Sequence, residues 1–147
     1  MTSLVRSIGI AAGFLVFASV QNASAQVTEP VKFTTSFPFT VGYATVPAGS
    51  YTIRPDDDNP SVFELTGAHT SVLFQTENAS VQQAPAKTEV VFKRYGDGYV
   101  LKNIWVEGST SGAETLAVEG ERHAAKNQGV QSEQHVAATK LGASKAR

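Results

Sequence analysis

The feature that most constrains the fold of this chain is the alternation of apolar and polar residues over residues 31–106. A period of two is typical of β-strands that bury one face. The residues 99–106 are apolar on both faces, which is typical of a central strand. The alternating apolar runs are Val31 and Phe33; Phe37, Phe39 and Val41; Tyr51 and Ile53; Phe63 and Leu65; Val72 and Phe74; and Val90 and Phe92.

The segments between these runs have the composition of turns. Val46-Pro47-Ala48-Gly49 combines a proline with a fixed φ and a glycine that tolerates a positive φ. The strongest hairpin signal is Gly96-Asp97-Gly98, between Tyr95 and Tyr99. Asp-Gly supplies the two residues of positive φ that a type I′ turn requires, so we expect a tight hairpin at this point.

The strand pattern predicts an all-β fold, namely a single small antiparallel β-sandwich or barrel of about seven to eight strands. After Gly112 the alternation stops, and we expect a flexible or partly helical C-terminal tail. The β-domain is therefore assigned to residues 26–120. Residues 121–147 are polar and rich in small side chains, and they are predicted to be disordered because they bury too little apolar surface.

The first 25 residues have the three parts of a cleaved signal peptide. Arg6 is followed by an apolar run of 13 residues, 8–20, and then by Ala23-Ser24-Ala25. The run is too short to cross a bilayer, which takes about 20 residues, and no second long apolar run follows. We therefore expect cleavage before Gln26, a mature chain without a transmembrane segment, and a periplasmic or extracellular location.

Composition excludes several classes of function. The chain has no cysteine, so a disulfide framework, a thiolate metal site and a cysteine nucleophile are all excluded. Its 12 Lys and Arg residues are balanced by 13 Asp and Glu residues, giving a net charge of −1. Nucleic-acid binding calls for a clustered basic face, so we expect no nucleic-acid partner.

Two segments support a resemblance to a known family. The first segment combines Pro38-Phe39-Thr40-Val41-Gly42 with Val46-Pro47-Ala48-Gly49-Ser50-Tyr51-Thr52-Ile53. The second combines Arg94-Tyr95-Gly96-Asp97-Gly98-Tyr99-Val100-Leu101 with Ile104-Trp105, and the two stand in the order seen in that family. Over residues 33–122 the chain resembles a family of small exported bacterial β-proteins of unknown function. The resemblance implies a β-fold and export, and it supplies no catalytic residue or ligand.

Polar residues give no pattern of a catalytic or metal site. His69, His123 and His135 match no zinc spacing. Asp56-Asp57-Asp58-Asn59 offers oxygens to a calcium ion, but the glycine and glutamate of an EF-hand loop are missing, and a solvated loop explains the segment. No Gly-x-Ser-x-Gly motif and no phosphate loop occur. We expect no metal, no cofactor and no catalytic residue.

Aromatic residues near the predicted hairpin are the best binding candidates. Tyr95, Asp97, Tyr99 and Trp105 would form a platform for a glycan or an envelope protein if their side chains converge. The alternative is that Trp105 joins the core and that the tyrosines are ordinary strand residues.

The sequence therefore predicts an exported, non-catalytic β-domain that binds an unknown ligand or associates with the envelope. A structural subunit that self-associates through edge strands is one alternative. A hydrolase is another.

Overall fold

The computed structural model describes residues 27–142. Ten strands and one helix lie within this range. The signal peptide predicted for residues 1–25 lies outside the described residues. The elements are β1 (Val31–Thr35), β2 (Phe39–Val41), β3 (Ala44–Val46), β4 (Gly49–Pro55), β5 (Val62–Thr66), β6 (Ser71–Ser80), β7 (Glu89–Tyr95), β8 (Gly98–Trp105), β9 (Ser111–Thr115), α1 (Glu119–Gln128) and β10 (Ser132–Lys140).

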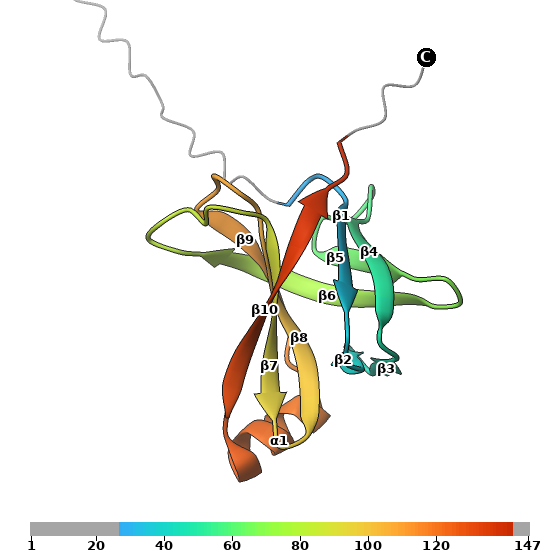
Figure 1. The fold of residues 1–147 in the computed structure, drawn as a ribbon, viewed down its shortest axis with the longest axis vertical. Coiled ribbons are helices and arrows are strands. Elements are labelled where there is room, and N and C mark those ends of the chain that lie inside the picture. Colours follow the sequence, from blue (N-terminus) through green and yellow to red (C-terminus); the bar gives the residue numbers. More distant parts are fainter. Residues whose placement is uncertain (1–26, 143–147) are drawn as a thin grey trace, which may run out of the picture.

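Eight of the strands close into an antiparallel barrel (Figure 1). Their order around the barrel is β1, β4, β5, β6, β9, β8, β7 and β10, and β10 returns to β1 to complete the ring. The predicted small antiparallel all-β domain is thus confirmed, and of the two architectures it is the barrel. Among the described residues, no helix is both long enough and apolar enough to cross a membrane.

The two remaining strands, β2 and β3, form a hairpin beside the barrel. β2 joins the wall through one parallel bridge, Thr40 to Val100 on β8, while β3 pairs, among the described strands, with β2 alone. The hairpin carries Phe39 and Val41 into the common core, where both are buried. Its apolar face therefore packs against the core of the barrel.

The core follows the period of two seen in the sequence. Phe39 and Phe92 are fully buried, with ring centroids 5.0 Å apart, and Tyr51 packs edge-on against Phe39 at 5.4 Å. Such tilted and perpendicular pairs are the favoured geometries for aromatic rings. The buried apolar residues of the strands include Val31, Phe33, Ile53, Phe63, Leu65, Phe74, Val90, Leu101, Ile104 and Ala113.

The two-residue turns of the β2–β3 and β7–β8 hairpins each begin with a glycine, which is followed by a larger residue. Gly42 has a φ of 57° and Gly96 a φ of 60°, and no non-glycine residue of the described chain has a positive φ. The hairpin predicted after Tyr95 is confirmed, but the predicted type I′ turn is wrong. A positive φ at the first central residue alone is typical of a type II′ turn, so Gly96 takes the role expected of Asp97 and Gly98.

A β-bulge interrupts the pairing of β7 with β8. Phe92 faces Leu101 and Val91 faces Asn103, which leaves Lys102 as an extra residue on β8. A bulge turns a side chain in a new direction. Here it lets two consecutive residues, Leu101 and Lys102, both be buried.

The prediction of a disordered tail over residues 121–147 is wrong for the described part of that segment. β10 lies between β1 and β7 and pairs with both, for example Val31 with Lys140 and His135 with Val91. The domain therefore extends well past the predicted limit at residue 120. Residues 143–147 lie outside the described range.

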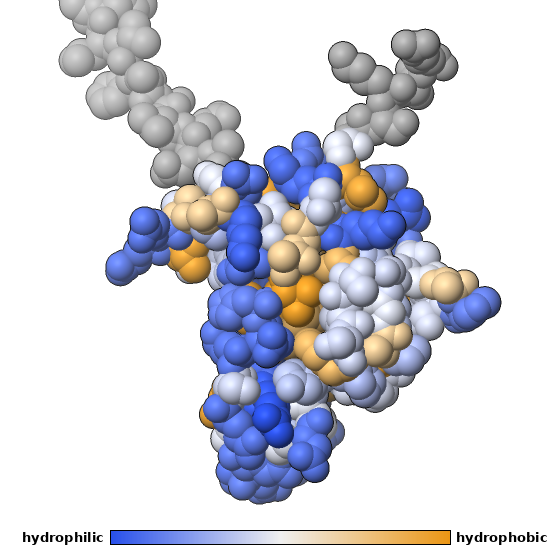
Figure 2. All heavy atoms as spheres, viewed as in Figure 1, coloured by the Kyte–Doolittle hydropathy of each residue, from blue (hydrophilic) through white to orange (hydrophobic). Residues whose placement is uncertain are grey.

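The physical reason is that β10 is held mainly through its backbone. A strand between two neighbours satisfies its N–H and C=O groups on both sides and needs few apolar side chains. On β10 only Val136 and Ala138 are half-buried, and its other side chains are exposed. The helix α1, which lies at the lower ends of β7 and β8 in Figure 1, is equally polar, since its one buried side chain is that of Glu121. Figure 2 shows this end of the molecule covered by hydrophilic residues.

Candidate functional site

The four residues predicted as a binding platform do not converge. Tyr95 is buried, with 7% of its surface exposed, whereas the Asp97 side chain lies fully in solvent at the turn. Tyr99 and Trp105 stand near opposite ends of β8. Only Tyr95 and Tyr99 line a common hollow, which does not include Asp97 or Trp105.

The rings of Tyr99 and Trp105 are largely occupied by neighbours. The Tyr99 ring stacks on Phe37 with centroids 4.1 Å apart, and the Arg94 guanidinium lies 6.0 Å from its centroid. The Trp105 ring packs across β9 against Gly112, its paired residue. The Tyr99 ring therefore lacks the open face that a sugar platform needs, and the Trp105 ring has Gly112 against it.

A groove forms where the barrel wall separates between β6 and β9. The two strands pair from Ser80 and Ser111 as far as Thr76 and Thr115, and then the chain after β9 leaves toward α1. The last link is the bond that Leu116 N–H donates to Gln75 C=O, 3.0 Å long. The tip of the β2–β3 hairpin lies in the opening beyond this bond: a Cβ at Gly42 would stand 3.5 Å from the Phe74 Cβ.

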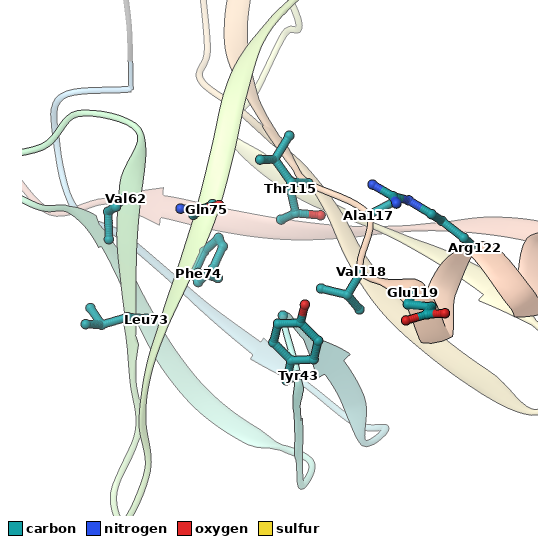
Figure 3. A pocket seen from close by; sticks show the side chains of 12 residues that line it. Tyr43, Val62, Leu73, Phe74, Gln75, Thr115, Ala117, Val118, Glu119 and Arg122 are labelled. Atoms are coloured by element: carbon teal, nitrogen blue, oxygen red, sulfur yellow. The ribbon is translucent and has the colours of Figure 1, made fainter.

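Two adjoining hollows make up this groove, which we call the Tyr43 groove. The β6 hollow has a volume of 630 Å³ and reaches Leu73 and Arg122 (Figure 3). The β8 hollow has a volume of 350 Å³ and reaches Tyr95 and Tyr99. Both are within the range of sites for small molecules, about 300–1,000 Å³. The residues common to the two hollows are Gly42, Tyr43, Thr115, Leu116 and Val118.

Exposed apolar side chains gather along the groove. Tyr43 is 91% exposed at the hairpin tip, and Leu73 is 65% and Leu116 40% exposed. These are three of the five large hydrophobic residues that the described chain exposes, the others being Val130 and Leu141. Neighbouring apolar side chains left in water commonly mark a binding surface, whereas isolated ones do not.

None of Tyr43, Leu73 and Leu116 is among the binding candidates that the sequence indicated. One signal was available for Leu73, because it lies out of phase between Val72 and Phe74 and so faces away from the barrel core. Leu116 lies in the segment between β9 and α1, where no periodicity applies. Its place in the groove follows only from the tertiary fold.

A buried polar cluster closes the inner side of the β8 hollow. Glu121 on α1 accepts a hydrogen bond from the Tyr95 hydroxyl at 3.3 Å, and its Oε1 lies 3.4 Å from Lys102 Nζ. Lys102 also lies 3.3 Å from Glu114 and donates to the Thr115 carbonyl at 3.1 Å. Burial, the charge of Glu121 and their hydrogen bond raise the pKa of Tyr95 to about 12. Each polar group of the cluster has a partner, which is the arrangement of a structural element.

Charged residues of α1 border the other end of the groove. Arg122 and Glu119 line the β6 hollow, and Lys126 follows Arg122 by one turn. Glu119 lies 3.6 Å from His123 Nε2. Within residues 27–142, neither Arg122 nor Lys126 takes part in an ion pair.

The histidines and the acidic loop form no metal centre in the part of the chain that the structure describes. His135 on β10 contacts Glu89 on β7 at 3.1 Å, whereas His123 contacts Glu119 within α1. The two histidines therefore belong to separate elements. In the acidic loop, Asp56 Oδ1 accepts the backbone N–H groups of Asp58 and Asn59 at 2.9 and 3.0 Å. This is the hydrogen bonding of an ordinary Asx turn.

Comparison of the whole chain with protein-family models, with curated proteins and with solved structures finds no match. The resemblance to a family of small exported β-proteins therefore stays a prediction.

Proposed function

We propose that this protein is an exported, non-catalytic binding module that takes an apolar ligand in the Tyr43 groove. The observation that carries the proposal is the gathering of Tyr43, Leu73 and Leu116 along one hollowed surface. Covering an exposed leucine or aromatic side chain contributes about 1.5–3 kcal/mol when burial is complete. A ligand that covers these three side chains gains much of its affinity from that burial.

Binding to the groove is tested with the neutral apolar dye N-phenyl-1-naphthylamine, whose fluorescence rises in apolar surroundings. We expect Tyr43→Ser and Leu73→Ser each to weaken dye binding about tenfold, the equivalent of about 1.4 kcal/mol. Val130→Ser and Leu141→Ser are the matched controls, because both residues are exposed and apolar but lie outside the groove. Equal dye binding by all four variants would overturn the proposal.

Export is supported by the sequence of the first 25 residues, and it has its own test. Mass spectrometry of the protein recovered from the periplasm or medium of an expressing bacterium gives its N-terminus. We expect a chain that begins at Gln26. An intact N-terminus, with the protein retained in the cytoplasm, would contradict this part of the proposal.

Assembly through an edge strand is the second candidate, and one observation bears on it. Among residues 27–142, β3 pairs with a single neighbour and its outer edge has no partner strand, but it spans only Ala44–Val46. Such short edges are a common protection against pairing between chains. A molar mass that rises with protein concentration, measured by light scattering, would favour assembly over the binding module.

A further inference from the structure

We propose that the ligand of the Tyr43 groove is a free single-chain aliphatic anion, such as a fatty acid monomer. Its chain would lie along Tyr43, Leu73 and Leu116, and its anionic group would meet the guanidinium of Arg122. This inference rests on the proposed function and adds the chemistry of the ligand to it.

The position of Arg122 carries the first step. Its backbone N–H donates to the Val118 carbonyl at 3.0 Å, which fixes the residue in the first turn of α1, beside the loop that lines the groove. Figure 3 shows its side chain reaching back from α1 over Ala117 toward Thr115. The guanidinium therefore stands at the rim of the β6 hollow without an ion-pair partner among residues 27–142.

The surrounding charges favour an anion at this rim. Glu119 lines the same hollow, but its carboxylate faces the ring of His123 at 3.6 Å. The side chains that β6 and β9 contribute to the hollow, including Leu73, Gln75 and Thr115, are uncharged. Lys126 adds a second cation next to Arg122 on the helix. A guanidinium binds a carboxylate with geometric specificity, through paired N–H donors.

The backbone around the groove disfavours an extended peptide as the occupant. Gln75 C=O already accepts from Leu116 N–H, and Thr76 N–H donates to Ser61 C=O on the opposite side of β6. The N–H and C=O of Leu73 therefore face the groove, because successive residues of a strand point their polar groups to alternate sides. Gly42 lies beside the Leu73 carbonyl, however, since a Cβ added at Gly42 would stand only 3.9 Å from that oxygen. The hairpin tip thus covers the edge to which a peptide strand would pair.

The test compares two ligands of equal chain length, sodium decanoate below its micelle concentration and 1-decanol. Each displaces N-phenyl-1-naphthylamine from the full mature protein and from Arg122→Gln. We expect this substitution to weaken decanoate about fivefold, a modest value because the arginine is exposed to solvent. The affinity for 1-decanol should not change. Lys87→Gln, an exposed cation outside the groove, is the control and should alter neither ligand.

The outcomes separate this inference from the proposed function. Equal affinity of decanoate for the wild type and for Arg122→Gln overturns the inference. In that case the proposed function still stands if dye binding depends on Tyr43 and Leu73. Dye binding that is independent of Tyr43 and Leu73 overturns both. Binding to vesicles of phosphatidylglycerol, lost in Arg122→Gln and without displacement by decanoate, identifies a membrane surface instead and also overturns the inference.

Discussion

Lys102 Nζ lies 3.4 Å from Glu121 Oε1, although the two residues belong to the barrel strand β8 and to the helix α1. Their side chains are 9% and 5% exposed, so the contact is shielded from water. The bulge on β8 directs Lys102 to this position, and Glu121 supplies the only buried side chain of α1. Together with the hydrogen bond from Tyr95 to Glu121, the pair links α1 to the barrel through side chains.

Removing the charge of Glu121 should destabilise the protein strongly. Glu121→Gln leaves the buried ammonium of Lys102 with one carboxylate fewer, and breaking a buried pair in this way costs about 3 kcal/mol. The free energy of unfolding, measured by urea denaturation, gives the loss directly. Hydrogen exchange should also show faster opening of α1 than of the barrel strands.

Glu114 provides the matched control for that variant. Its carboxylate lies as close to Lys102 Nζ, at 3.3 Å, but the Glu114 side chain is 35% exposed. Solvent weakens such a pair, so Glu114→Gln should cost less than about 1 kcal/mol. Equal losses for the two variants would show that burial does not govern this cluster.

Tyr95 should make the free energy of unfolding depend on pH in the alkaline range. Its pKa is raised to about 12 from an ordinary value of 10.0, first by burial and then by the charge of Glu121. The unfolded chain releases this proton near pH 10.0, so the stabilising contribution is complete below that pH and is lost as pH rises to about 12. Urea denaturation across this range should therefore give a falling free energy of unfolding.

The absorbance of the phenolate form measures the titration of Tyr95 directly. Burial also raises the pKa of Tyr51, so two of the described tyrosines should titrate late in the folded protein. Tyr95→Phe should remove one late step and flatten the alkaline loss of stability. If Tyr95→Phe titrated like the wild type, the pKa of Tyr95 would not be raised by burial and by Glu121.

Gly112 should not tolerate a larger side chain. A Cβ at this position would lie 2.5 Å from the Ile104 carbonyl oxygen and would also collide with the Trp105 ring. Such overpacking costs about 1–3 kcal/mol, so Gly112→Ala should lower the unfolding midpoint clearly.

Gly120→Ala is the opposite case and serves as the control. Gly120 lies inside α1 and has open space where a Cβ would stand. Alanine favours the helix over glycine by about 1 kcal/mol, so this variant should be as stable as the wild type or more stable. A loss of stability in both variants would point to a general effect of substitution rather than to the collision at Gly112.

The sequence pattern predicted those parts of the fold that depend on side-chain burial. Phe33 and Ile53 could be assigned to a core because each stands on the apolar face of an alternating strand. The groove could not be predicted in this way. Tyr43, Leu73 and Leu116 come from a turn, a strand and a connecting segment, and only the separation of β6 from β9 brings them together.

The C-terminal strand was missed for a different reason. Its stability comes from backbone pairing with β1 and β7, and backbone hydrogen bonds leave no signal in composition. A segment such as Ser132–Lys140, with half-buried side chains only at Val136 and Ala138, therefore resembles a disordered tail when it is considered alone. Its two partners are far away in the sequence.

Truncation tests this assignment. A chain that ends after residue 128 lacks β10, so β1 and β7 each lose a neighbour and the barrel opens between them. Unpaired strand edges promote association between chains. We expect the truncated protein to lose its cooperative thermal transition, followed by circular dichroism, and to elute as aggregates on size exclusion.

A chain that ends after Gly142 is the control, because it keeps every pair between β10 and its neighbours. This protein should melt cooperatively. Val136→Asp gives a finer test within the intact chain, since Val136 packs against the core while its neighbour His135 faces solvent. Val136→Asp should therefore destabilise the barrel more than His135→Asp. An unchanged transition after loss of residues 129–147 would show that β10 is dispensable and that the barrel is stable with an open wall.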